Sequence, residues 1–135
     1  MQHKAVLTLD EVNIILNAAR EEAESNNWKV SIAMVDDGGH PLGLVRMNDC
    51  APISAYIAME KARSAALGRR ESKNFEDMIN NGRTAFLSAP LLSGMLEGGV
   101  PVLVGGQVVG AVGISGLTPD LDARIAKAGI AALER

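Results

Sequence analysis

Apolar residues recur along this chain with two spacings, one typical of helices and one typical of strands. A helical stripe begins after Thr8, and Thr8 and Glu11 have the spacing of a capping box, which closes the first turn of a helix. Asp49 is expected to cap a second helix, and Pro119 follows Thr118 at the start of the last one. These patterns predict helices over residues 8–26, about 50–67, about 75–80 and from 118 onward.

The strand patterns come in two pairs, and a short turn separates the members of each pair. The segment 30–35 carries small or apolar residues on both faces, which predicts a central strand covered on both sides. Residues 37–39, Asp-Gly-Gly, are a hairpin signal, and on the return strand Arg46 is expected to share a face with Leu42 and Leu44. The predicted pairs are 30–35 with 42–47 and 100–104 with 108–114.

The order of these elements is helix, hairpin, helix, short helix, hairpin, helix. Hairpins join antiparallel strands, which excludes a doubly wound parallel sheet. The length of 135 residues is close to that of one domain. The sequence therefore predicts a single α/β (α+β) domain over residues 1–135, in which helices flank both faces of an antiparallel sheet. Residues 83–99 mix Gly, Pro and Ser with short apolar runs and give no assignment.

The composition narrows the class of protein further. The net charge is -3 and no basic face is implied, which argues against nucleic acid as a partner. No stretch is long and apolar enough to span a bilayer, and residues 1–9 lack the apolar core of a signal peptide, so a cytoplasmic location is expected. One cysteine and two histidines do not make a dedicated zinc site, and no metal is predicted.

Two features leave room for a flat ligand. Gly110 and Gly113 lie on one predicted strand, where glycines mark either a close approach by another element or an opening for a planar molecule. His40 follows the first hairpin turn, where it is either a solvated turn residue or one axial ligand of a haem iron.

Charged residues on apolar faces are the most informative sign of a site. Glu60 lies in the middle of an apolar face of the predicted second helix, and Arg46 lies on the apolar face of its strand. Two explanations stay open: an internal Arg46–Glu60 ion pair that holds the fold, or an anion-binding pocket with a tunable acid. In the second case Arg46, Glu60 and Lys61 are expected to converge near Gly98-Gly99.

The predicted second helix also has a face made of small residues. Ile53, Ile57 and Leu67 are expected to pack on the sheet, which would leave the small face free. Alanines permit close approach of two helices, and a two-fold contact between copies is the commonest way to cover such a face. The sequence therefore predicts a homo-oligomer whose contact is made by Ala58, Ala62, Ala65 and Ala66.

Motifs over nearly the whole chain resemble one protein family. They lie at residues 26–40, 46–52, 60–63, 66–70, 80–86, 97–101 and 110–116. In these motifs the chain is similar to the GlcG and haem-binding HbpS-like family, which is related to the C-terminal domain of the PduO corrinoid adenosyltransferase. The resemblance implies a profilin-like fold that often assembles into oligomers.

The residues and the resemblance together leave three functions open. The preferred one is a small-molecule-binding accessory protein for glycolate utilisation, in which Arg46 and Lys61 hold a small carboxylate. The second is haem or corrinoid binding, and haem is the cofactor that the resemblance implies. The third is a small lyase similar to hydroxylaminobenzoate lyase, with Glu60 and Lys61 as catalytic candidates. The ligand-binding candidates are Asp36, His40, Arg46, Asp49, Glu60, Lys61, Gly98 and Gly99.

Overall fold

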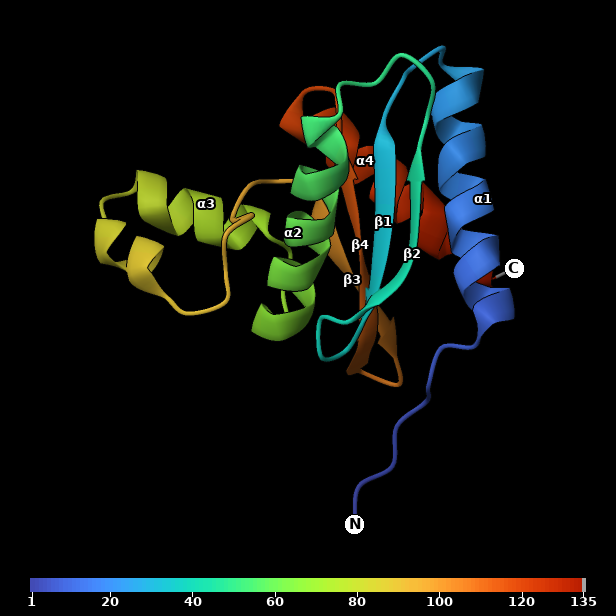
Figure 1. Cartoon of the computed structure of the whole chain (residues 1–135). Helices are drawn as coiled ribbons and strands as arrows, with labels where there is room; N and C mark the ends of the chain where they lie inside the picture. Colours follow the sequence, from blue (N-terminus) through green and yellow to red (C-terminus); the bar gives the residue numbers. More distant parts are fainter. Residues whose placement is uncertain (135) are drawn as a thin grey trace.

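A four-stranded antiparallel sheet forms the middle layer of the computed structural model, which describes residues 1–134 (Figure 1). The strand order is β2-β1-β4-β3, so that each hairpin supplies one half of the sheet and β1 pairs with β4 across the centre. The strands are β1 (Ser31–Asp36), β2 (Pro41–Arg46), β3 (Gly99–Val104) and β4 (Gln107–Ser115).

Four α-helices and two short 3₁₀ helices accompany the sheet within residues 1–134. Their bounds are α1 (Leu9–Ser25), α2 (Ile53–Gly68), α3 (Lys73–Asn80), η1 (Thr84–Ser88), α4 (Pro119–Ala131) and η2 (Ala132–Glu134). No helix in this part of the chain is both long enough and apolar enough to cross a membrane.

The predicted element order and antiparallel sheet are confirmed. Thr8 and Glu11 form the expected capping box at the start of α1, and Pro119 begins α4 directly after Thr118. The prediction for the start of α2 is wrong, because the helix begins at Ile53 and Asp49 lies in the preceding loop with a left-handed backbone (φ 68°). A proline at position 52 disfavours a helical backbone at the residue before it, which delays the helix.

The two faces of the sheet are packed in different ways. Helices α1 and α4 cover one face of the sheet (Figure 1). Large side chains on that face, such as Ile32, Met34 and Ile114, form the main core. Helix α2 covers the other face, and there the facing residues are small. A Cβ atom added to Gly113 of β4 would lie 2.0 Å from the carbonyl oxygen of Ala58 of α2. The backbone of α2 therefore rests directly on β4.

This close contact contradicts the predicted use of the small face of α2. Its four alanines, expected to meet a second copy of the chain, have no exposed surface and pack on the sheet of their own chain. Ile53, expected to face the sheet, is 63% exposed. The physical reason is that a sheet surface of Gly, Ala and Ser accepts only an equally small helix face at this distance.

The edge strand β2 stays partly open on the α2 side. Helix α2 lies over β1 and β4, and Leu44 and Arg46 of β2 are exposed. A bulge in the β1–β2 pairing moves the register from Gly43 to Pro41 within one step of β1. As a result Leu42 packs against the core on the α1 side. The prediction that Leu42 shares a face with Leu44 and Arg46 is therefore wrong for Leu42.

Residues 73–96 form an arm that projects beside α2, away from the sheet (Figure 1). Its two short helices, α3 and η1, pack on each other through the rings of Phe75 and Phe86, whose centroids are 5.2 Å apart. The unassigned segment 83–99 supplies η1 and the chain that returns to β3.

Candidate ligand-binding site

The predicted site residues lie in separate places. His40 and Arg46 stand at opposite ends of β2, and six residues of extended chain put roughly 20 Å between them. Asp36 and His40 lie at the β1–β2 turn, and Arg46 and Glu60 line a cleft between β2 and α2. Lys61 lies with Gly98 and Gly99 in the buried contact between α2 and β3. Asp49 lies exposed in the loop before α2.

The cleft between β2 and α2, here called the β2–α2 cleft, has a volume of about 410 Å³. It exists because α2 stands over the middle of the sheet and leaves the α2-facing side of β2 only partly covered. Arg46 and Glu60 are the charged residues of its lining. The remaining walls are formed by Leu44, Pro52, Ala55, Tyr56 and Met59.

The side chains of Arg46 and Glu60 differ in the partners that they have within the protein. The Glu60 carboxylate accepts hydrogen bonds from Arg63 and from the Ser93 hydroxyl, each at 2.9 Å. Arg46 forms no hydrogen bond or ion pair with its side chain anywhere in residues 1–134. The internal Arg46–Glu60 ion pair, one of the two explanations from the sequence, is therefore not formed. The cleft instead presents an unpaired guanidinium with five N–H donors.

Lys61 lies inside the protein and does not reach the cleft. It is 4% exposed, and its Nζ donates to the Ile114 carbonyl oxygen at 2.9 Å and to Oδ2 of Asp122 at 3.1 Å. The other carboxylate oxygen of Asp122 accepts a hydrogen bond from the Leu117 N–H group at 3.1 Å. This buried ion pair connects α2, β4 and the start of α4, which gives Lys61 a structural role.

Gly98 and Gly99 belong to the same buried contact. A Cβ atom at Gly98 would lie 2.9 Å from Nζ of Lys61, and one at Gly99 would lie 2.2 Å from the Lys61 carbonyl oxygen. The predicted convergence of Arg46, Glu60 and Lys61 near these glycines is therefore split: the first two share the cleft, and Lys61 lies with the glycines.

The predicted site residues did not include Asp122, although the sequence carries a signal that this residue is buried. Asp122 precedes the buried residues Ile125 and Ala126 by three and four positions, so it shares their face of α4. Burial raises the pKa of its carboxyl group, and the charge and hydrogen bond of Lys61 act in the opposite direction. The rule that selects Glu60, an acid on an apolar helix face, also selects Asp122.

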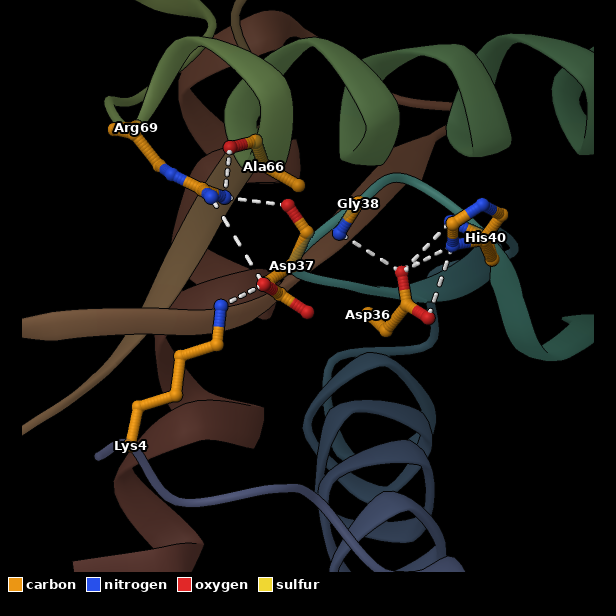
Figure 2. Close-up of polar contacts among 7 residues, drawn as sticks. All are labelled: Lys4, Asp36, Asp37, Gly38, His40, Ala66 and Arg69. Atoms are coloured by element: carbon orange, nitrogen blue, oxygen red, sulfur yellow. Dashed lines mark hydrogen bonds and ion pairs between the residues drawn. The ribbon is translucent and has the colours of Figure 1, made fainter. Parts of the chain in front are cut away.

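The β1–β2 turn holds a second arrangement of polar side chains (Figure 2). Oδ1 of Asp36 accepts hydrogen bonds from the N–H groups of Gly38 and His40 at 2.9 Å and contacts Nδ1 of the His40 ring at 3.0 Å. Burial raises the pKa of Asp36, but these hydrogen bonds outweigh it and keep the pKa below its usual value. Asp36 is thus ionised at neutral pH, and Nε2 of the 77% exposed His40 side chain is left free of this contact.

Within the same turn, Asp37 connects three segments of the chain. Its carboxylate pairs with Lys4 of the N-terminal segment, and its carbonyl oxygen accepts a hydrogen bond from Arg69 at the end of α2 (Figure 2). Leu7 of the same N-terminal segment fills the space beside Gly110, where an added Cβ would lie 2.8 Å from its side chain. Gly110 and Gly113 therefore mark close approaches and leave no opening for a flat ligand at these two positions.

The fold and the cleft define a class of small α+β proteins in which one helix of small residues crosses an antiparallel sheet and leaves a sheet edge open. The chain belongs to the HbpS-like family: the family model described as "haem degrading protein HbpS-like" matches residues 7–131. It is 63% identical over 115 residues to Protein GlcG of Escherichia coli strain K12, and the match covers 85% of each chain. The family predicted from the sequence motifs is confirmed.

Solved structures agree with this assignment. The crystal structure of a double mutant of HbpS from Streptomyces reticuli matches 98% of this chain and 90% of its own, with 30% identity and a TM-score of 0.88. The crystal structure of PduOC in complex with heme matches 95% of each chain, with 26% identity and a TM-score of 0.84. The predicted similarity to the PduO C-terminal domain is confirmed at the level of the fold.

Replacement of Lys61 by methionine is expected to lower the free energy of unfolding by about 3–5 kcal/mol, because the Asp122 carboxylate is left buried without a partner. Urea denaturation at neutral pH measures this loss. The double variant Lys61→Met with Asp122→Leu removes both charges and is expected to recover most of the stability. A single variant as stable as the parent protein would contradict the structural role of the pair.

The pH dependence of the Lys61→Met variant provides a second readout. Burial already raises the pKa of Asp122, and the substitution removes the lysine that lowers it. The Asp122 carboxyl group then binds more protons in the folded variant than in the unfolded chain, so its contribution to stability is fully present below the unfolded pKa of about 4 and is lost as the pH rises through the folded pKa. The double variant, which lacks this carboxyl group, is the control and should not show that decline.

Proposed function

We propose that this protein is a small-molecule-binding accessory protein and that Arg46 recognises a carboxylate group in the β2–α2 cleft. The observation that carries the proposal is the guanidinium of Arg46, which has no partner within residues 1–134 and lines a cleft whose acidic residue, Glu60, is already bonded to Arg63 and Ser93. A guanidinium binds a carboxylate through two parallel hydrogen bonds, which fixes both position and orientation.

The relatives support a role in small-molecule binding. One solved neighbour is a complex with heme, and Protein GlcG of Escherichia coli is a relative of this chain in sequence. A place in glycolate utilisation, which the family resemblance implies, is part of this proposal, as is a cytoplasmic location. A small lyase receives less support, because both oxygens of Glu60 accept hydrogen bonds and Lys61 is buried against Asp122.

Assembly into a homo-oligomer is also proposed, through a surface other than the predicted alanine face. The arm of residues 73–96 exposes several large apolar side chains that its own chain does not cover. Exposed apolar patches of this kind mark contacts with another protein surface. The residues are Leu87, Leu91 and Leu96.

Substitution of Arg46 by alanine is expected to weaken the binding of carboxylates by about tenfold or more, because a charge-assisted hydrogen bond contributes about 1.5–3 kcal/mol. Isothermal titration calorimetry with a panel of monocarboxylates measures the change. Arg46→Lys keeps the charge but loses the paired donors and should bind with intermediate affinity.

The matched control for this experiment is Lys29→Ala. Lys29 and Arg46 line a neighbouring hollow, but Lys29 is not part of the β2–α2 cleft, so its loss removes a nearby charge and leaves the cleft intact. Carboxylate affinity that is equal in the Arg46→Ala variant and the parent protein, or the lack of binding by every acid in the panel, would rule out the proposal.

Haem binding through His40 is a second candidate, and the contact between Asp36 and His40 favours it. A carboxylate that contacts Nδ1 fixes the orientation of a histidine ring and makes Nε2 a stronger electron-pair donor to a metal, as found at many metal-binding histidines. His40 thus fits as an axial ligand, and haem bound there would supply a redox-active iron. The strand glycines add no slot for the ring, because Leu7 and α2 fill the space beside them.

If haem binds in this way, His40→Ala is expected to abolish the shift of the Soret band when purified protein is titrated with haem. Asp36→Asn should retain a weaker shift, because it keeps the turn but lacks the charge that orients the ring. Identical spectra and affinities for the parent protein and the His40→Ala variant would exclude His40 as the iron ligand.

A further inference from the structure

The size of the β2–α2 cleft bears on which acids fit it. Its volume is about 410 Å³, and a two-carbon acid such as glycolate would occupy only a small part of that space. A ligand bound through its carboxylate alone would leave the rest of the cleft in contact with water. The cleft is thus suited to a larger molecule than the simplest acids.

The walls of the cleft indicate the chemistry of the rest of that molecule. Leu44 and Tyr56, large side chains that proteins usually cover, are 49% and 77% exposed here. Met59 and Ala55 continue the apolar surface along α2. An apolar ligand surface placed on these side chains gains about 25 cal/mol for each Å² removed from water, and a ring stacked on Tyr56 gains further from aromatic contact.

The charges around the cleft determine where an acid group would lie. Within the cleft, Arg46 carries an unpaired charge, while Glu60 is neutralised by Arg63. On its other side Arg46 borders a polar hollow that Lys29 also lines. Arg46 therefore marks the boundary between an apolar compartment and a polar one, so a ligand that uses both must carry its carboxylate at one end of an apolar body.

We infer that the ligand of the β2–α2 cleft is a carboxylate with a ring-sized apolar body, of the chemical class of aromatic acids. Its carboxylate meets the guanidinium of Arg46, and its ring lies between Tyr56 and Leu44. This inference rests on the proposed function, the recognition of a carboxylate by Arg46, and adds the nature of the body that the carboxylate is attached to.

The experiment compares benzoate and glycolate as probes of the full chain, by calorimetry and by amide chemical shifts. Benzoate is expected to bind at least about tenfold more tightly than glycolate, because only benzoate covers the apolar walls. Tyr56→Ala should weaken benzoate binding by about fivefold to tenfold and leave glycolate unchanged, whereas Tyr56→Phe should bind benzoate like the parent protein. Lys29→Ala, outside the cleft, is the control for general charge effects.

The outcomes separate this inference from the proposed function. Equal affinities for the two acids, both lost in the Arg46→Ala variant and both unchanged in Tyr56→Ala, would overturn the inference and leave carboxylate recognition standing. Benzoate binding that survives Arg46→Ala, or no binding of either acid, would overturn both. Circular dichroism of each variant verifies that a loss of binding does not come from a loss of fold.

Discussion

The close approach of α2 to the sheet is the constraint on which the other features of this structure depend. Helix and strands meet through Gly113 on one side and alanines on the other, and a single added methyl group at Gly113 would overlap the Ala58 carbonyl group. A helix held this close lies mainly over β1 and β4 and covers β2 only in part. The open side of β2, and with it the β2–α2 cleft, follows from this position.

The same contact explains why Lys61 and Arg46 have different roles. Lys61 is on the side of α2 that faces β4 and the start of β3, where burial requires a partner, and Asp122 supplies it. Arg46 is on the uncovered strand, where a charge needs no partner in the protein. The cleft thus stands on rigid elements on both sides, since α2 is fixed by its ion pair and β2 by its pairing with β1.

Local features of the fold could be predicted from the sequence because their signals lie within a few residues. The capping box at Thr8, the proline at the start of α4 and the glycine turns of both hairpins are of this kind. The presence of Arg46 and Glu60 in one place also follows from a local rule, that charges are rare on apolar faces. For these features the pattern and the structure agree.

The remaining features depend on contacts between distant segments. Both faces of α2 are apolar, and the choice between them is made by the small residues of β4, about fifty positions away. The bulge that turns Leu42 to the other side depends on the pairing with β1, and the partner of Lys61 is sixty-one residues distant. No periodicity within a single helix or strand carries that information.

A crystal structure of the protein grown with benzoate would show whether the space left beside α2 receives a carboxylate at Arg46. Recognition of a carboxylate by Arg46 predicts benzoate in the β2–α2 cleft, with both carboxylate oxygens on the Arg46 guanidinium and the ring against Tyr56. An Arg46 side chain turned onto Glu60 so that the cleft is closed, or benzoate bound elsewhere while the cleft holds only water, would contradict it.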